Sequence, residues 1–562
     1  MIRTVSLLAA SGLALATIGC GGGGSFLPKN VFPTREKVAA LAEAPVKPIP
    51  ARAVATAPAW KVDPAGADAP TPVEQRFAQA AGGTITFTRE MRCIAREAAR
   101  FHLEHGAQPD ERLERFIAGA CGSTLPFVGF GAATGQMAPE MSDDEVIAQW
   151  AQKLEVPESY RNKHGGIWLA RNGDRVVVAT TIAKPEAVVT VTQADASGVV
   201  VVKGTAPAKT EAIIALVNQG QNVATCDPDL DVPLPLFSFR CTMAQGDRTA
   251  WIEVSARPEG RLLTSSVVRA LARRDAGPLD YVAPARAAAG STIDPAAVLE
   301  GVNRARANVR LPPVALAPAQ SATNGRLAPH FFQASLDDDQ EKSDVLGLGL
   351  IAGWDVEGMI RDGNLFAALL SGSGDAGAWL DYVLETPMGR HTVLTPRAAQ
   401  VAVGVARRET VGGLGAVITT YEFFGEEDHK ADAHRVLLRL QRARLSRGLS
   451  KPVPIEGLDR LAAQATLVRD NQKDALEALN DGLTAERDHS GRGVRGWVVA
   501  TNDIETMPLP PELLATGQLA VGIEVTHYRP EGAPWGYYVV FFLVPSDAGS
   551  QTAKAPNRSS AF

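Results

Sequence analysis

An internal repeat constrains the fold of this 562-residue chain more than any other feature of its sequence. The segment VLEGVNRAR at 298–306 returns as VLLRLQRAR at 436–444, and a leucine follows at the same distance, Leu311 in the first case and Leu449 in the second. Both comparisons give an offset of 138 residues. Apolar residues at positions i, i+1 and i+4 of each segment predict a helix with one buried face. The second half of the chain is therefore expected to hold two domains of one fold.

The two domains also end alike. Residues 401–405 (VAVGV) precede a predicted strand over 416–423, and residues 519–523 (LAVGI) precede another over 536–544. Helices at the start and paired strands at the end predict an α/β layered domain. With the segments described below, we expect a multidomain α+β protein.

The order of these motifs resembles the CAP superfamily, the SCP-like extracellular domains. In that family a helix carrying Asn-x-x-Arg leads to a Leu-Pro-Pro turn, then to a Ser-Pro-x-His-Arg motif and a glycine-containing strand. The positions that match are Asn303, Arg306, Leu311, Pro312, Pro313, Pro387, Arg390 and Gly404. The resemblance covers roughly 293–425, with weaker matches over 433–545 and 73–186. It implies CAP-like domains built as α-β-α sandwiches.

The family's usual site is a cleft with two His and two Glu that can hold a divalent metal, and this chain departs from it. Gly389 stands where the family has the His of its Ser-Pro-x-His-Arg motif, and His391 lies two residues later. His330 lies several residues before the expected place of the other His, and Glu357 is the candidate for one Glu. One ligand of four does not make a metal site, so we expect no metal and no cofactor. His330, Glu357 and His391 are the candidates for a catalytic acid–base cleft.

The first twenty residues have the pattern of an export signal. Arg3 supplies a positive charge, and residues 5–18 form an apolar stretch that is short for a membrane span but typical of a signal-peptide core. Small residues lead to Cys20, and a glycine-rich run follows it. This pattern resembles the bacterial lipobox, although Thr17 stands where Leu is usual. The resemblance implies cleavage after residue 19 and lipidation of Cys20; a plain secretory signal cleaved near Cys20 is the alternative.

Lipidation would decide where the protein resides. Two or more acyl chains anchor a protein stably to a membrane. No later segment approaches the roughly 20 apolar residues of a membrane helix, so the lipid is the expected anchor. Gly21 in place of Asp implies the outer membrane, by resemblance to the known sorting pattern. We therefore expect a lipid-anchored protein of the bacterial cell envelope.

The four other cysteines predict two disulfides. They fall into two local pairs, Cys93 with Cys121 and Cys226 with Cys241, and such bonds persist in the oxidising space outside the cytoplasm. A zinc site made of all four would need CxxC-like spacings, which are absent from the sequence.

Local patterns predict several further elements. Residues 89–103 read as an amphipathic helix, residues 142–154 as a second helix capped at Ser142, and Asn172-Gly173 as a two-residue hairpin turn. Short strand-like runs separated by turn residues between 187 and 288 predict a β-sandwich of immunoglobulin-like type.

The chain is accordingly expected to contain seven segments. They are a signal peptide (1–19), a lipidated tether (20–72), an α+β domain with a weak CAP-like match (73–186), the β-sandwich (187–288), a CAP-like domain (289–426), a second degenerate CAP-like domain (427–546) and a disordered tail (547–562).

Two functions from different classes fit this organisation. The first is a cell-envelope lipoprotein whose CAP-like domains form a non-catalytic binding or structural scaffold, with a lipid or protein ligand. The alternative is an envelope hydrolase that uses His330, Glu357 and His391. Nucleic acid is not expected as a partner, because the 56 basic and 62 acidic residues are interspersed, the net charge is −6 and aromatic residues make up only 6%.

Overall fold

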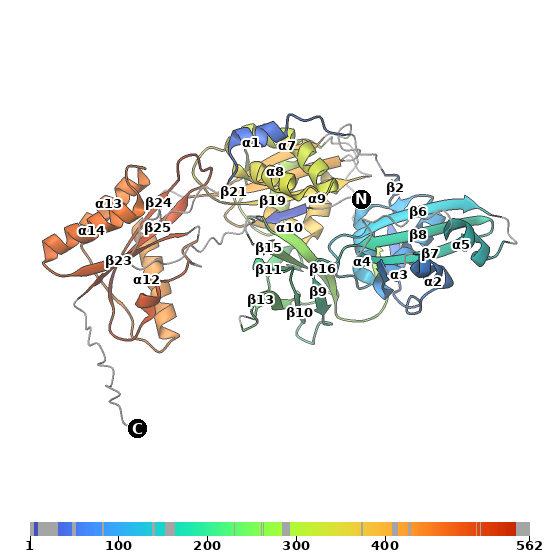
Figure 1. Ribbon diagram of the computed structural model, residues 1–562, viewed down its shortest axis with the longest axis horizontal. Coiled ribbons are helices and arrows are strands. Elements are labelled where there is room, and N and C mark those ends of the chain that lie inside the picture. Colours follow the sequence, from blue (N-terminus) through green and yellow to red (C-terminus); the bar gives the residue numbers. More distant parts are fainter. Residues whose placement is uncertain are drawn as a thin grey trace, which may run out of the picture. The chain divides into compact units, whose positions relative to one another are not determined.

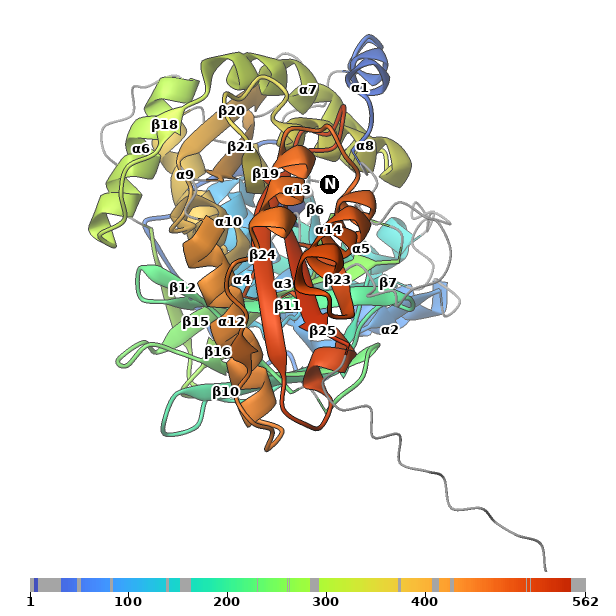
Figure 2. The same ribbon diagram turned by 90° about the vertical axis from the view of Figure 1, so that its left-hand side faces the viewer.

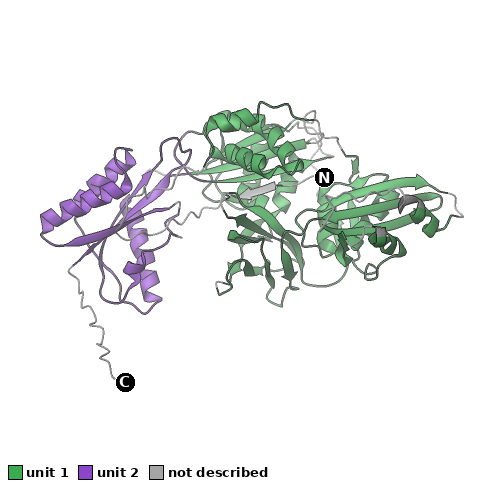
Figure 3. Cartoon of the chain, viewed as in Figure 1, with its two compact units in different colours: residues 1–9, 33–356, 363–422 green, residues 10–32, 357–362, 423–562 purple. Residues whose placement is uncertain are grey.

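The chain is a mixed α+β protein, as its sequence predicts. The computed structural model describes residues 5–8, 32–47, 52–80, 84–137, 141–151, 163–229, 231–259, 261, 263–283, 293–371, 375–406, 414–424, 429–501, 503–505 and 507–546. Two compact units are distinguished in Figure 3. One holds residues 1–9, 33–356 and 363–422, and the other holds 10–32, 357–362 and 423–562.

The same four-stranded arrangement occurs three times along the chain (Figure 1). In each copy the first strand is parallel to the second, and the second is antiparallel to the third. In spatial order the strands are β4 (Ile85–Phe87), β7 (Lys163–Asn172), β8 (Arg175–Ala183) and β6 (Gly129–Gln136); β18 (Ala315–Leu316), β20 (Gln400–Ala406), β21 (Leu414–Phe423) and β19 (Ile360–Leu370); and β22 (Val453–Pro454), β24 (Ala520–Tyr528), β25 (Tyr537–Pro545) and β23 (Val494–Thr501). We name these regions repeat A (72–183), repeat B (295–423) and repeat C (429–545).

The helices follow the same order in the three repeats. Along the chain, one helix precedes the first strand of this spatial order, and two helices lie between the first strand and the fourth. One further helix in repeats A and C, and two in repeat B, lie between the fourth strand and the second. They are α2 (Pro72–Ala80), α3 (Arg89–His105), α4 (Glu111–Ala120) and α5 (Asp143–Ala151) in repeat A; α6 (Pro295–Asn308), α7 (Pro318–Leu336), α8 (Gln340–Ala352), α9 (Ala376–Glu385) and α10 (Pro387–Leu394) in repeat B; and α12 (His429–Leu445), α13 (Asp459–Arg469), α14 (Ala475–Ser490) and the 3-10 helix η2 (Pro511–Leu514) in repeat C. The repeat found in the sequence over the second half therefore extends to the first.

Each sheet is covered by helices on both faces. In repeat C, α12 packs against alternate residues of β23, β24 and β25, whereas α13 and α14 pack against the residues in between (Figure 2). In repeat A, α2 and α5 cover one face and α3 the other. Side chains of successive strand residues point to opposite faces, so each strand supplies two cores.

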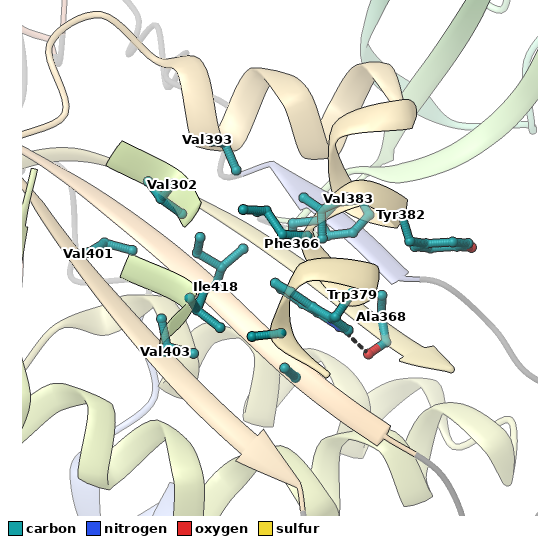
Figure 4. Close-up of a cluster of buried hydrophobic side chains, with 14 of the residues drawn as sticks. Val302, Phe366, Ala368, Trp379, Tyr382, Val383, Val393, Val401, Val403 and Ile418 are labelled. Carbon is teal, nitrogen blue, oxygen red and sulfur yellow. Dashed lines mark hydrogen bonds between the residues drawn. The ribbon is translucent and has the colours of Figure 1, made fainter. Parts of the chain in front are cut away.

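One core of repeat B lies between its sheet and three helices. Phe366 and Ala368 of β19, Val401 and Val403 of β20 and Ile418 of β21 pack against α6, α9 and α10 (Figure 4). Trp379 of α9 is completely buried among them, and its indole Nε1–H donates to the carbonyl of Ala368 at 3.1 Å. The partner of that N–H lies in the sheet, so the bond holds α9 on this face.

The local signals in the sequence specify their elements. The helix predicted over 89–103 is α3, which is capped by Thr88. Ser142 and Glu145 cap α5 reciprocally, since each side chain accepts a hydrogen bond from the backbone N–H of the other. The predicted two-residue hairpin turn is present but shifted by one residue: Asn172 pairs with Arg175, so the loop residues are Gly173 and Asp174 and not Asn172 and Gly173. Gly173 has φ +62°, as the first position of such a turn requires.

Two facing sheets form the β-sandwich between repeats A and B. The first contains β13 (Asp227–Pro228), β14 (Leu236–Thr242), β10 (Val199–Thr205) and β9 (Val188–Val191), and the second contains β12 (Asn222–Thr225), β11 (Thr210–Gln219), β15 (Thr249–Pro258) and β16 (Ser265–Arg273). Their inner residues form one core, which includes Cys226 and Cys241. Both predicted disulfides are present, Cys93–Cys121 and Cys226–Cys241.

Part of the segment expected to be a tether, 20–72, is folded. The strand β3 (Ala59–Val62) pairs with β17 (Leu279–Val282), and Trp60 and Val62 are buried in a core shared with α3 and α4. The short strand β2 (Val54–Ala55) pairs with β5 (Gln108–Pro109), and Val38 of α1 (Arg35–Leu41) contacts α8. The alternation of apolar and polar residues in Ala59–Val62 is that of a half-buried strand. β17, which lies within the predicted sandwich segment, therefore belongs to the core of repeat A.

One strand lies within the segment expected to be a signal peptide. β1 (Val5–Leu8) pairs antiparallel with β19 at the outer edge of the sheet of repeat B. Cys20 and the tail 547–562 lie outside the described residues. Across the part of the chain that the structure covers, no helix combines the length and the apolar character of a membrane span.

Candidate functional site

Arg306, the arginine of the Asn-x-x-Arg motif, is buried and binds only backbone carbonyls. Its Nε donates to Pro312 O at 2.8 Å, and its Nη1 donates at 2.9 Å to the carbonyls of both Val393 and Thr395. Nη2 contacts the carbonyl of Ala398 at 3.4 Å. The guanidinium thereby ties α6 to the loop after it and to the end of α10.

Arg444 makes the same clamp in repeat C. Its Nε donates to Ser450 O at 2.9 Å, six residues downstream as in repeat B. Nη1 donates to the carbonyls of Leu513 and Ala515, and Nη2 donates to that of Gly517 at 2.7 Å. The repeated arginine is therefore a structural residue whose donors are used within each repeat.

The motif around 387–391 joins α10 to the sandwich. Arg390 donates to Leu384 O at 2.7 Å and to the carbonyls of Gly220 and Asn222, at the turn between β11 and β12. Burial lowers the pKa of Arg390 to about 10. A Cβ on Gly389 would lie 2.4 Å from the carbonyl oxygen of Val383, so the position leaves no space for the histidine that the family has there.

The structure places the two candidate histidines on opposite faces of one sheet. Thr419 of β21 accepts a hydrogen bond from the side chain of Asn324 in α7, the helix that carries His330. The next residue, Thr420, donates a hydrogen bond to a backbone carbonyl of α10, the helix that carries His391. Successive strand residues point to opposite faces, so His330 and His391 do not share a cleft. Glu357 is exposed in the loop before β19.

Burial dominates the electrostatics of both histidines. It lowers the pKa of His391 to about 4. Burial and, to a smaller degree, the ammonium of Lys342 lower the pKa of His330. Both imidazoles are therefore neutral at pH 7.

A buried ion pair of the sandwich contacts repeat B. Glu253 of β15 is fully buried and pairs with Arg269 of β16 at 2.7 Å. The other carboxylate oxygen of Glu253 accepts the backbone N–H of Met388 at 3.1 Å, in the first turn of α10. A carboxylate at a helix N-terminus is favoured by the free N–H groups and the helix dipole.

A second ionic cluster connects repeat A to repeat B. Arg112 and Arg115, one turn apart on α4, both pair with Glu385 at the end of α9. The guanidinium of Arg115 also lies 4.1 Å from the ring centroid of Tyr382. Burial, followed by smaller effects that include repulsion from Arg269, lowers the pKa of Arg115 to about 10. Asn218 of β11 donates to the carbonyl of Glu385 at 2.8 Å, so repeat A, the sandwich and repeat B meet at one residue.

We call the set Arg112, Arg115, Glu253, Arg269 and Glu385 the charged junction. Sequence reasoning missed it, although a signal was present. Glu253 and Arg269 each stand inside an apolar strand, in WIEVSA and SVVRALA, where an unpaired charge would be costly. The pairing itself could not be read from those positions, because the third partner lies 135 residues further along the chain.

A groove of about 310 Å³ lies beside the Cys93–Cys121 disulfide, where the end of α4 approaches β9 and β16. Two arginines line it, but their guanidinium groups already have hydrogen-bond partners within the protein. Arg89 pairs with Asp68, and Arg273 donates to the carbonyls of Ala120, Asp275 and Gly277. The groove therefore gives no support for a charged ligand.

A histidine pair in repeat C is the other titratable feature missed by sequence reasoning. His429 and His527 lie with ring nitrogens 3.2 Å apart, and Phe424 stacks on His527. Among the residues described, no three His, Cys, Asp or Glu side chains gather as metal ligands would. Neither a model of a protein family nor a curated protein matches the sequence of this chain.

Proposed function

We propose that the chain is a lipid-anchored protein of the bacterial cell envelope that serves as a non-catalytic scaffold for binding a lipid or protein ligand. CAP-like domains in the three repeats and an immunoglobulin-like sandwich would form this scaffold. The observation that carries the proposal is the use of the motif arginines. The guanidinium N–H groups of Arg306, Arg390 and Arg444 donate to backbone carbonyls of the protein, as expected of residues with a structural role.

The charged junction supports the same proposal. It places ion pairs between repeat A and repeat B, and it includes a buried pair of the sandwich whose carboxylate accepts a backbone N–H of repeat B. Separating repeat A from repeat B would leave the buried guanidinium groups of Arg112 and Arg115 without the Glu385 carboxylate, which is unfavourable. A rigid framework can present a binding surface with little loss of conformational entropy on binding.

The arrangement of layers supports the CAP-like interpretation. Each repeat has helices on both faces of a mixed sheet, as the resemblance implies for an α-β-α sandwich. Two facing four-stranded sheets with a disulfide in the core are compatible with the immunoglobulin-like interpretation.

The envelope location rests on the leader sequence and on the two disulfides, which are typical of oxidising compartments. The test is mass spectrometry of the protein purified from bacterial membranes, beside a Cys20→Ser variant. We expect an acylated N-terminus at residue 20 for the unaltered chain and an unlipidated product for the variant. A protein that retains Met1 in the soluble fraction would refute the proposal.

The hydrolase alternative is tested separately with His330→Gln and His391→Gln, alone and combined. If the scaffold proposal is right, the combined variant complements a deletion strain as well as the unaltered protein does. A loss of complementation with unchanged protein abundance and unchanged thermal unfolding would favour the hydrolase.

A further inference from the structure

The sheet of repeat B has one more strand, within the described residues, than the sheets of repeats A and C. β1 pairs with β19 in the register Val5 with Ala367, Ser6 with Phe366, Leu7 with Leu365 and Leu8 with Asn364. Within the described residues, the equivalent strands β6 and β23 end their sheets without a further partner. β1 is therefore an addition to the repeated fold, seated at an edge that the fold itself leaves open.

β1 lies in a slot that is bounded by three elements. Besides β19, β1 contacts β16 of the sandwich and α10 of repeat B. These elements are held together independently of β1, because α10 receives the Glu253 carboxylate at its first turn and Arg390 bonds to the sandwich. Removal of β1 would therefore leave the slot in place.

The chemistry of the slot selects an extended, uncharged segment. With β1 in place, Leu365, Phe366 and Ala367 are at most 1% exposed, and the Asn364 side chain is bonded to Thr395 at the end of α10. Directly paired residues in antiparallel strands share a face, so alternate residues of an occupant would face buried apolar surface on each side of the sheet. A charged side chain at these positions would lose its hydration without gaining a partner.

We infer that, in the mature protein, the edge of β19 at 364–367 is a strand-addition site for an extended apolar segment of a partner protein. The inference rests on the proposed function, since cleavage before Cys20 removes the residues that form β1. An unpaired strand edge offers a row of backbone N–H and C=O groups to an added strand. β1 shows the geometry of such an occupant, and strand addition is an established mode of peptide recognition.

The experiment uses the full-length mature lipoprotein, purified in detergent, and a synthetic peptide of residues 3–10 (RTVSLLAA) as the probe. Hydrogen exchange is measured at the amides of 364–367, with 494–501 of β23 as the matched edge in repeat C. We expect the 364–367 amides that point away from β21 to exchange fast in the mature protein and to become protected when peptide is added. Exchange in β23 should not change.

Peptide variants test backbone pairing and apolar selection. Ser6→Pro combined with Leu7→Pro removes two backbone donors, and Leu7→Asp places a charge opposite Leu365. Each should weaken binding at least about tenfold in fluorescence anisotropy, which is about 1.4 kcal/mol. Equal affinity for all three peptides would overturn the inference.

Two outcomes separate this inference from the proposed function. If the purified protein is acylated at Cys20 but its 364–367 amides are already protected and bind no peptide, the inference fails and the lipoprotein proposal stands. If the protein still begins at Met1 with residues 5–8 protected, β1 is a permanent strand and both proposals fail.

Discussion

Two buried arginines at equivalent positions stabilise repeats B and C, and each has an exposed neighbour on the same helix. Arg306 and Arg444 are at most 1% exposed, whereas the side chains of Arg304 and Arg442, two residues earlier, are 65% and 71% exposed. The difference arises because the buried pair faces the carbonyls at the end of α10 and at the end of η2. This contrast allows a matched test of the clamp.

Replacing Arg306 with Met should lower the free energy of unfolding by about 3 kcal/mol, because several buried carbonyls lose their donors. Arg444→Met should do the same. The controls Arg304→Met and Arg442→Met should change stability by less than about 0.5 kcal/mol. Urea unfolding of the full chain checks this, and equal effects at buried and exposed positions would show that the clamp contributes little.

His391 should make stability depend on pH. Burial lowers its folded-state pKa to about 4, below the value of 6.5 for an exposed histidine. The unfolded chain therefore binds more protons than the folded chain between these pH values. The contribution of neutral His391 to the free energy of unfolding is fully present above pH 6.5 and declines as the pH falls towards 4. The loss attributable to His391 is at most about 3 kcal/mol.

Thermal unfolding of His391→Asn between pH 4 and 7 checks this expectation. The variant should lose less stability on acidification than the unaltered protein. His489→Asn, at an exposed position at the end of α14, is the control and should follow the unaltered curve. An identical pH slope for all three proteins would contradict the assignment.

At the scale of elements, a glycine on the second strand of each sheet permits a close approach. Gly166 of β7, Gly404 of β20 and Gly522 of β24 are the glycines on this strand in repeats A, B and C. A Cβ there would lie 2.1 Å from the carbonyl oxygen of Met91, 2.5 Å from the backbone of Asn324, and 2.5 Å from a side-chain methyl of Leu458, respectively. The first two contacts are to backbone, which cannot rotate away.

We therefore expect a graded effect of alanine at these positions. Gly166→Ala and Gly404→Ala should destabilise the protein by about 1–3 kcal/mol, because a helix must shift. Gly522→Ala should have a smaller effect, since the end of the Leu458 side chain can move. Gly325→Ala in α7, where a Cβ meets open space, should be neutral or stabilising. Calorimetry of the four variants checks the order, and a larger effect at Gly522 than at Gly404 would refute it.

The elements that could be predicted from the sequence are those with local signals. The cap at Ser142 was predicted correctly and the hairpin turn was placed within one residue of its position, because the partners of both lie within a few residues. The strand at Ala59–Val62 was not predicted, although its residues alternate between exposed and buried as those of a half-buried strand do. Its partner, β17, lies more than 200 residues away, and no local sequence pattern indicates which strand it pairs with.

At the scale of the whole molecule, the charged junction lies where repeat A, the sandwich and repeat B meet. Glu253→Gln would leave Arg269 buried without its counter-charge, and we expect a loss of about 3–5 kcal/mol. Glu259→Gln is the control, because its side chain is 63% exposed and should change stability little. Urea unfolding, monitored on the full chain, measures both.

A double replacement distinguishes a lost charge pair from a general loss of packing. Glu253→Met combined with Arg269→Leu removes both charges from the interior and should recover at least half of the lost stability. If the double variant is less stable than Glu253→Gln, packing and not charge compensation is the main contribution of the pair.

The sequence by itself determined the repeat, the disulfide pairs and the mixed α+β class, because helical and strand periodicity and short cysteine spacing are local properties. Only the tertiary structure decided what the motif residues do. Arg306 meets the carbonyl groups of α10, His330 and His391 lie on opposite faces of one sheet, and Glu253 caps a helix of another domain. Periodicity specifies which face of an element is buried, but the element that covers this face follows from contacts between distant segments.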